Sequence, residues 1–174
     1  MSVTLILGGA RSGKSGFAET RAKSSEQPVI YIATAEIRDD AIAERVSLHR
    51  KTRPSNWTSI ESPLALGQSI RKYDSPTATL LVDCLTMWVT NVLCSENPTD
   101  LMHSEQREFF QSLAEHQGNV ILVSNEVGMG IVPMGQLTRD YVDIAGRLHQ
   151  DIAALADEVI LVTAGLPLTL KHTS

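Results

Sequence analysis

Residues 8–15 of the chain are Gly8-Gly9-Ala10-Arg11-Ser12-Gly13-Lys14-Ser15, which matches the phosphate-loop pattern G-x-x-x-x-G-K-[S/T]. The apolar run Val3–Leu7 precedes this stretch and has the composition of a buried strand. The run Ser15–Ala22 follows it and has the composition of a helix. A phosphate site of this kind requires a strand, a glycine loop and a helix N-terminus, so the stretch predicts a nucleotide-binding fold. The alternative is a glycine-rich turn that matches the pattern by chance.

The residue types in this loop suit a nucleoside triphosphate and a magnesium ion. Glycines allow backbone N–H groups to turn inward onto phosphate oxygens. The start of the helix adds uncapped N–H donors and a partial positive charge. We expect Lys14 to reach the β- and γ-phosphates as a catalytic residue, and the hydroxyl of Ser15 to hold Mg²⁺.

The bulk composition indicates an ordinary globular chain. Its 174 residues are enough for one domain with a substantial core, and we expect residues 1–174 to form a single catalytic domain. The net charge of −5 argues against a nucleic-acid or anionic-membrane binder, because both need a basic face. No apolar run reaches the roughly 18 residues of a membrane span, and no signal peptide is expected. Cys84 and Cys94 lack metal-ligand spacing, which favours packing residues in a reducing cytoplasm.

Strand-like and helix-like segments alternate along the chain. The strand candidates are continuous runs of Val, Ile and Leu, which is typical of parallel strands covered on both faces. They are Val3–Leu7, Val29–Ala33, Thr79–Val82, Val120–Val123 and Val159–Val162, with Trp57–Ile60 as a further short strand. The alternation predicts an α/β fold, a P-loop NTPase-like three-layer domain with a mostly parallel central sheet.

Helices are expected between these strands. Apolar residues recur at helical spacing over Asp40–Lys51, Leu101–His116 and Gln136–Ala156. The polar stretch Ser95–Asp100 predicts a surface loop, and we expect the tail after Leu170 to be loose.

Asp83 ends an apolar strand, as the aspartate near Mg²⁺ does in phosphate-loop proteins. Together with the glycine loop, this placement predicts that Asp83 lies near the metal, directly or through water. The alternative is that Asp83 caps the following helix, which we expect over Leu85–Leu93.

His49 lies on the apolar stripe of its predicted helix, among the cationic residues Arg45, Arg50, Lys51 and Arg53. A histidine in this position is often a buried core residue. The functional interpretation is that its imidazole attacks phosphorus, while the cationic neighbours keep it neutral and balance the charge of a triphosphate.

The stretch Asn125–Pro133 follows the fourth long strand and contains two glycines and a proline. Loops at the carboxyl ends of strands line the ligand crevice of open α/β sheets. The stretch is therefore either a shaped substrate lid or an ordinary connection.

Together, these residues resemble the bifunctional adenosylcobinamide kinase / adenosylcobinamide-phosphate guanylyltransferase family of cobalamin assembly. The resemblance runs in order over nearly the whole chain, and its most selective string is Asn125–Pro133. The matching segments are residues 8–15, Tyr31–Ala35, Asp39-Asp40, Arg45–Arg50, Arg53-Pro54 with Trp57, Val82–Asn91, Ser124–Pro133, Arg139–Tyr141, Asp143–Gln150 and Ala156–Val159.

The resemblance implies a two-step chemistry. First, a hydroxyl group of adenosylcobinamide takes the γ-phosphoryl group of a nucleoside triphosphate. GTP then guanylylates a histidine with loss of pyrophosphate, and the GMP passes to adenosylcobinamide phosphate to give adenosylcobinamide-GDP. His49 matches the guanylylated histidine, and Leu48 precedes it where some members carry a second histidine.

The resemblance also implies Mg²⁺ as cofactor, GTP or ATP as phosphate donor, and a homotrimer. It assigns further positions to the nucleotide site. These are Ala33, Thr34, Ala35, Arg50, Lys51, Thr52, Arg53, Glu61 and Asp83. The sequence leaves open whether the kinase step prefers ATP or GTP, and whether both activities are present.

Two other classes of protein carry the same glycine loop. A monofunctional small-molecule kinase would use the loop and Asp83 without a covalent adduct, and His49 would then be a core residue. A GTP-driven switch usually carries Asp-x-x-Gly and Asn-Lys-x-Asp. Here Asp83 is followed by Cys84-Leu85-Thr86, and Asn125 by Glu126-Val127-Gly128, which disfavours a switch.

Overall fold

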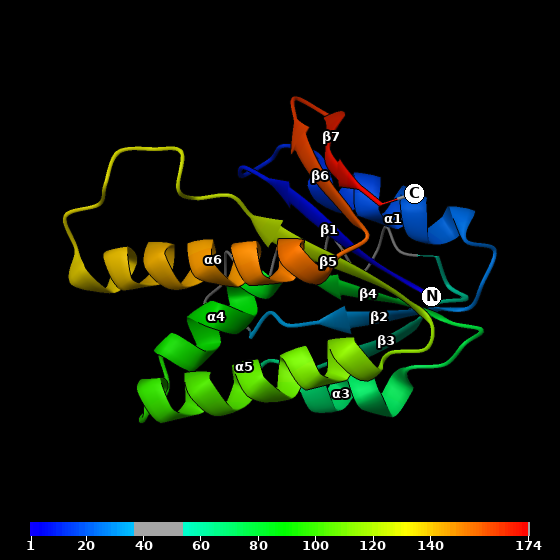
Figure 1. Ribbon diagram of the computed structural model, residues 1–174, viewed down its shortest axis with the longest axis horizontal. Helices are drawn as coiled ribbons and strands as arrows, with labels where there is room; N and C mark the ends of the chain where they lie inside the picture. The colour runs from blue at the N-terminus through cyan, green and yellow to red at the C-terminus, as the bar shows by residue number, and fades with distance from the viewer. Residues whose placement is uncertain (37–53, 174) are drawn as a thin grey trace.

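In the computed structural model, the glycine loop joins the first strand to the first helix of an α/β sheet (Figure 1). The structure describes residues 1–36 and 54–173. The strands are β1 (Ser2–Gly8), β2 (Val29–Ala33), β3 (Thr58–Glu61), β4 (Thr79–Asp83), β5 (Asn119–Asn125), β6 (Glu158–Thr163) and β7 (Leu166–His172). The described helices are α1 (Lys14–Ser24), α3 (Leu66–Tyr73), α4 (Leu85–Leu93), α5 (Pro98–Glu115) and α6 (Gln136–Leu155).

The strands form one sheet in the order β3-β2-β4-β5-β1-β6-β7. Every pairing from β3 to β6 is parallel, and β7 runs antiparallel to β6 at one edge. The carboxyl ends of β1 to β5 therefore meet along one edge of the sheet. Within that row, β5 lies between β1, which enters the glycine loop, and β4, which ends at Asp83.

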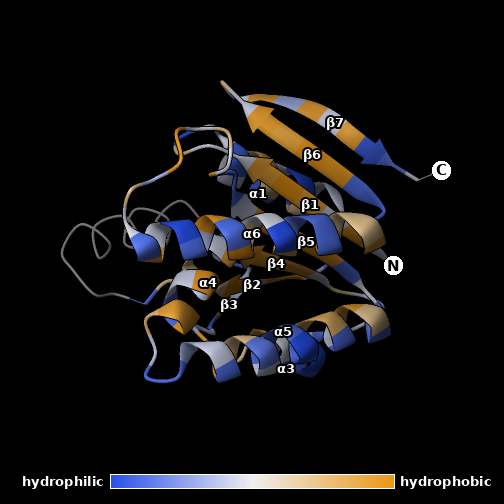
Figure 2. Cartoon of the chain, turned by 60° about the vertical axis from the view of Figure 1, so that its left-hand side comes forward, coloured by the Kyte–Doolittle hydropathy of each residue, from blue (hydrophilic) through white to orange (hydrophobic). Residues whose placement is uncertain are grey.

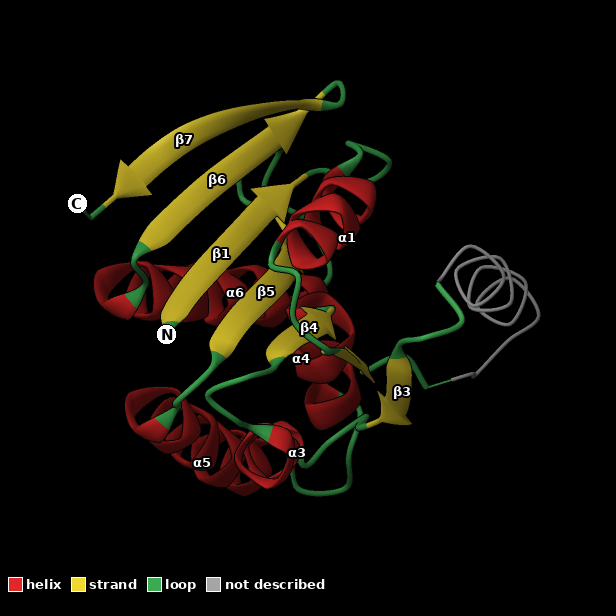
Figure 3. Ribbon diagram, turned by 90° about the vertical axis from the view of Figure 1, so that its right-hand side faces the viewer, coloured by secondary structure: helices red, strands yellow, loops and turns green. Residues whose placement is uncertain are grey.

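Helices cover both faces of the sheet, with α1 on one face and α3, α4, α5 and α6 on the other (Figure 3). Alternate side chains of a strand enter different cores. In β1, Leu5 and Leu7 join the core on the four-helix side, whereas Ile6 joins the core that contains Ala18 and Ala22 of α1. This double burial explains the continuous apolar runs of the inner strands. Figure 2 shows hydrophobic strands inside and hydrophilic residues along α5 and α6.

The predicted α/β three-layer fold with a mostly parallel sheet is confirmed. All six predicted strands are present, with bounds close to those expected, and so are the helices after the glycine loop, after Asp83 and before β6. The predicted helix over Asp40–Lys51 lies outside the described residues. The short helix α3 was not predicted, although Leu66, Ile70 and Tyr73 recur at helical spacing, because its eight residues are fewer than a helical pattern usually spans.

Three local predictions were wrong. The tail after Leu170 is not loose: β7 reaches His172, because the positive φ angles of Ala164 and Gly165 turn the chain back onto β6. The polar stretch before α5 is a loop only as far as residue 97, since Pro98 opens the helix and needs no N–H partner there. Cys84 packs against the core as expected, but Cys94 is exposed.

Two helical glycines predict opposite effects of an added methyl group. A Cβ on Gly67 would lie 2.5 Å from the backbone carbon of Glu108, at the contact between α3 and α5, whereas nothing lies within 4 Å of a Cβ on Gly146. We expect Gly67→Ala to lower the free energy of unfolding by about 1–3 kcal/mol through overpacking. Gly146→Ala should raise it by about 0.5–1 kcal/mol through helix propensity. Urea unfolding of both variants measures this, and an undiminished stability of Gly67→Ala would contradict the packing of α3 on α5.

Candidate active site

The backbone of the glycine loop curves from the end of β1 to the start of α1. Arg11 and Gly13 have positive φ angles of 57° and 93°, and the Ser12 N–H donates to the Gly9 carbonyl at 3.2 Å. Gly13 is the N-cap residue of α1, and no side chain caps that helix. The first N–H groups of α1 therefore remain available to an anion, as in a phosphate site.

Gly8 and Gly13 are each required in the loop for a different structural reason. A Cβ on Gly8 would lie 2.5 Å from both the Ser12 hydroxyl and the Val162 carbonyl, so packing alone requires glycine there. Gly13 needs its left-handed backbone, and a Cβ on it would lie 3.2 Å from the Cα of Gly165. A Cβ on Gly9 would meet nothing within 4 Å, so the backbone is open at that point.

The β6–β7 turn supports the glycine loop from outside the motif. The Gly165 N–H donates to the Ser12 carbonyl at 2.8 Å, beside Gly13. This support was not predicted, because it joins residues that are far apart in the sequence and no local pattern indicates it.

Lys14 places a buried positive charge inside the loop. Its side chain is 5% exposed, and Nζ donates to the Gly9 carbonyl at 3.2 Å. Burying an ammonium group is costly unless negative groups surround it. A phosphate held in the loop would supply such a group.

The predicted site residues at strand ends lie in one row along the carboxyl edge of the sheet. The register pairs Glu61 with Ala33, Ala33 with Asp83, and Gly8 with Asn125. The order along this edge is therefore Glu61, Ala33, Asp83, the end of β5, and the glycine loop. This edge is where ligands of open α/β sheets bind.

The Asp83 carboxylate is fixed by a hydrogen bond and does not cap the following helix. The Tyr31 hydroxyl donates to its Oδ2 at 3.0 Å. Cys84 is the N-cap residue of α4, which has no side-chain cap bond, so the capping alternative receives no support.

The predicted metal ligands have suitable chemistry. Mg²⁺ prefers hard oxygen ligands, which the Ser15 hydroxyl and the Asp83 carboxylate provide. Over residues 1–36 and 54–173, no group of three or more His, Cys, Asp or Glu side chains could hold a metal by itself. An ion at this site would therefore complete its shell with phosphate oxygens and water, as Mg²⁺ usually does.

The other predicted nucleotide residues fall into two groups. Thr34 is fully buried and supports the β4–α4 turn, since its hydroxyl donates to the Cys84 carbonyl at 2.6 Å and accepts from the Cys84 N–H at 2.9 Å. Ala33 and Ala35 are half-buried, and Glu61 is exposed at the end of β3. His49, Arg50, Lys51, Thr52 and Arg53 lie outside the described residues.

A polar cluster at the end of β5 includes Glu126, which belongs to the stretch interpreted as a substrate lid or an ordinary connection but was not among the predicted site residues. His149 of α6 is buried, its Nε2 lies 2.7 Å from the Ser124 hydroxyl, and its Nδ1 lies 3.9 Å from Oε2 of Glu126. Burial lowers the pKa of His149, an effect that Glu126 partly offsets. The signal in the sequence was the change from an apolar strand to the polar run Ser124-Asn125-Glu126.

Hydrophobic side chains gather on the loop between β5 and α6. They are exposed by 78% at Met129, 98% at Ile131, 76% at Val132 and 95% at Met134. Figure 2 shows this loop reaching away from the sheet between the two elements. Exposed apolar side chains of this kind are typical of contact surfaces, and the interpretation of the loop as a substrate lid stays a prediction.

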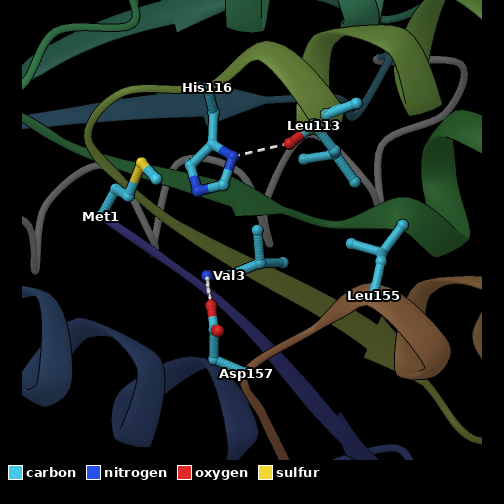
Figure 4. A pocket seen from close by; sticks show the side chains of 7 residues that line it. Met1, Val3, Leu113, His116, Leu155 and Asp157 are labelled. Atoms are coloured by element: carbon cyan, nitrogen blue, oxygen red, sulfur yellow. Dashed lines mark hydrogen bonds between the residues drawn. The ribbon is translucent and has the colours of Figure 1, made fainter.

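A cavity of about 260 Å³ lies at the opposite edge of the sheet (Figure 4). Its lining includes Met1, Val3, His116 and Asp157, which stand at the amino ends of strands or the carboxyl ends of helices. The Asp157 carboxylate accepts the Val3 N–H, and His116 Nδ1 lies 2.6 Å from the Leu113 carbonyl. The cavity therefore does not belong to the row that contains the glycine loop.

Solved structures of other proteins have a similar fold. An ATPase of the type III secretion system of pathogenic bacteria has a TM-score of 0.53 at 12% identity, over 97% of this chain and 57% of that one. The RadB recombinase has a TM-score of 0.51 at 15% identity, over 92% and 73%. With its glycine loop, buried Lys14 and Asp83, the chain is a P-loop NTPase-like α/β protein.

Sequence comparison gives the family. Residues 4–170 match the model of the cobinamide kinase / cobinamide phosphate guanyltransferase family. The chain is 48% identical to the bifunctional adenosylcobalamin biosynthesis protein CobP of Pseudomonas aeruginosa over 96% of each chain. It is 39% identical to the corresponding CobU protein of Escherichia coli over 96% of this chain and 98% of that one.

The chain belongs to the cobinamide kinase / cobinamide phosphate guanyltransferase family, and it is a bifunctional enzyme of cobalamin biosynthesis. This confirms the resemblance found in the sequence. Among the helices that the structure describes, none is long and apolar enough to cross a membrane.

The left-handed backbone of Gly13 predicts a specific loss of nucleotide affinity. A Cβ in this conformation costs about 1–2 kcal/mol, so Gly13→Ala should weaken binding of magnesium GTP about 5- to 30-fold. Gly146→Ala on α6, where an added Cβ meets nothing within 4 Å, should bind as tightly as the unchanged protein. Calorimetric titration measures both, and equal affinities for the two variants would contradict the loop as the phosphate site.

Proposed function

We propose that residues 8–15 hold the triphosphate of GTP or ATP for both reactions, and that GMP transfer proceeds through a covalent adduct on His49. The observation that carries the first part is the combination of the uncapped N-terminus of α1 with the buried Nζ of Lys14. Oriented N–H groups and a fixed cation stabilise the charge that develops as phosphates separate.

In the kinase step, the hydroxyl oxygen of adenosylcobinamide attacks the γ-phosphorus. The bond from that phosphorus to the β–γ bridging oxygen breaks, and the nucleoside diphosphate leaves. Lys14 balances the charge that grows on the leaving phosphates. Ser15 and Asp83 would hold Mg²⁺, which supplies further charge neutralisation when bound.

In the guanylyl step, an imidazole nitrogen of His49 attacks the α-phosphorus of GTP, and pyrophosphate leaves. A phosphate oxygen of adenosylcobinamide phosphate then attacks the same phosphorus, the P–N bond breaks, and adenosylcobinamide-GDP forms. The covalent adduct divides one transfer between bulky anions into two displacements. Arg50, Lys51, Thr52 and Arg53 follow His49 and would neutralise the nucleotide, a proposal that rests on the family resemblance.

Position in the chain supports His49. Its segment, residues 37–53, follows β2, whose last residue Ala33 pairs with Asp83 at the carboxyl edge. The proposed nucleophile therefore belongs, in sequence, to the connection that follows Ala33, and Ala33 pairs with the proposed metal ligand Asp83.

We propose further that the protein acts in the cytoplasm as a homotrimer. Two free cysteines suit a reducing compartment. Leu166, Leu168 and Leu170 expose a row of apolar side chains on the edge strand β7, a surface suited to contact with another subunit. Sedimentation equilibrium tests the trimer.

Lys14→Ala should abolish both phosphorylation and guanylylation, because both reactions would use one triphosphate site. The loss should be about 3 kcal/mol or more in each barrier, by analogy with the removal of an oxyanion donor. Lys23→Ala, at the end of α1, is the matched control and should keep both activities. Guanylylation of Lys14→Ala at the wild-type rate would show that the two steps use separate sites.

His49→Ala should separate the two activities. Phosphorylation of adenosylcobinamide needs no covalent histidine and should continue, whereas the protein–GMP adduct and adenosylcobinamide-GDP should disappear. The wild-type adduct should be labile in acid and stable in alkali, as a phosphoramidate is. His103→Ala, on the exposed side of α5, is the control.

The measurement is protein-bound label after incubation with α-labelled GTP, followed by acid or base. Undiminished labelling of His49→Ala would contradict this assignment and leave Lys51 or His149 as the next candidates. A wild-type protein that forms adenosylcobinamide-GDP without ever taking label would contradict only the covalent adduct.

A further inference from the structure

Glu126 places a carboxylate directly beside the glycine loop. It follows the last residue of β5, and its N–H donates to the Gly8 carbonyl at 3.0 Å. Neighbouring strands lie about 4.8 Å apart. By the strand order, Asp83 is then about 10 Å and Glu61 about 19 Å from the strand that enters the loop. Among the described carboxylates that end or follow β3, β4 and β5, Glu126 is nearest to the proposed phosphate site.

The Glu126 carboxylate is held in place but remains open on one side. Oε1 accepts the Gly128 N–H at 2.5 Å, and Oε2 lies 3.9 Å from Nδ1 of His149. The side chain is 21% exposed. One oxygen is therefore used to fix the group, and the other keeps lone pairs for a further partner.

The surroundings of Glu126 favour a hydroxyl-bearing ligand. The Asn125 Oδ1 atom is buried, and within residues 1–36 and 54–173 it has no hydrogen-bond partner. The Tyr141 hydroxyl is also buried, and the Thr86 side chain lies beside it. Burial raises the pKa of Tyr141 to about 12, so its hydroxyl stays a donor. Buried polar groups without partners are uncommon in proteins, and a bound polar ligand would satisfy them.

Neither Ser124 nor His149 places a fixed positive charge beside the Glu126 carboxylate. Burial holds the pKa of His149 below its usual value, so its imidazole is neutral near pH 7. Ser124 is likewise neutral, and its hydroxyl contacts His149 Nε2. Glu126 can thus take up a proton without first breaking a buried ion pair.

We propose that Glu126 accepts the proton of the substrate hydroxyl group in the kinase step, with Tyr141 and Asn125 binding that end of the substrate. This inference rests on the proposed function only for the position of the triphosphate in residues 8–15. The hydroxyl oxygen bonds to the γ-phosphorus, the bond to the leaving nucleoside diphosphate breaks, and the hydroxyl proton moves to Oε2 of Glu126. Bulk water then removes the proton from the exposed side of the carboxyl group.

A purely structural role makes a different prediction. If Glu126 only fixes the turn through the Gly128 N–H, then Gln can replace it, because its amide oxygen also accepts that bond. A proton acceptor cannot be replaced by Gln, since a neutral amide does not take up the proton. Glu126→Gln therefore separates the two roles, and Glu126→Asp retains the carboxylate at a shorter reach.

The test measures two reactions on each variant: phosphorylation of adenosylcobinamide, and protein labelling by α-labelled GTP. Glu126→Gln should lower the kinase kcat about 100-fold, with the KM for adenosylcobinamide within about threefold of wild type. It should take GMP label at the wild-type rate, because labelling involves no substrate hydroxyl. Glu126→Asp should recover part of the kinase kcat. Glu96→Gln, on the exposed connection before α5, is the charge-matched control and should match wild type in both.

A kinase kcat of Glu126→Gln within threefold of wild type would overturn the proposal, and so would an equal loss of both reactions, which indicates a structural role. An unlabelled wild-type protein together with a kinase defect in Glu126→Gln would support Glu126 and contradict only the His49 adduct.

Discussion

The left-handed backbone of Gly13 is the constraint on which the rest of the site depends. It turns the chain from the end of β1 into α1 and leaves the first N–H groups of that helix without a side-chain cap. The β6–β7 turn stabilises this loop, because the Gly165 N–H donates a hydrogen bond to the Ser12 carbonyl. The same curve brings the Nζ of Lys14 back over the Gly9 carbonyl. Lys14 therefore brings a positive charge to the uncapped N-terminus of α1, and in the proposed function such preorganised groups stabilise phosphoryl transfer.

The order of the strands determines which groups can act on a nucleotide held there. Because β5 is inserted between β1 and β4, its carboxyl end separates the glycine loop from Asp83. In the proposed function, residues 8–15 after β1 hold the polyphosphate and Asp83 at the end of β4 holds the metal, so the polar cluster at the end of β5 lies between them. In the sequence, the segment with His49 follows β2. The proposed function therefore assigns attack at the γ-phosphorus and attack at the α-phosphorus to groups from different connections of the chain.

Much of this could be predicted from the sequence, because the strongest signals are local. The glycine loop and its flanking strand and helix follow from the motif, and the parallel strands follow from apolar runs that are buried on both faces. The β7 strand was missed because both of its faces are largely exposed, although Leu166-Pro167-Leu168-Thr169-Leu170 alternates with the period of a strand. His149 was passed over as a site residue because its partners, Ser124 and Glu126, lie more than twenty residues away in sequence. Only the tertiary fold brings α6 onto the end of β5.

The central claim is that one triphosphate site serves both reactions, and nucleotide stoichiometry tests it most directly. Calorimetric titration with the β,γ-imido analogue of GTP, in magnesium, should give one nucleotide per chain. After saturation with that analogue, the ATP analogue should show no further binding, because both need the N–H groups between Gly8 and Lys14. Two nucleotides bound per chain, or independent binding of the second analogue, would contradict the account.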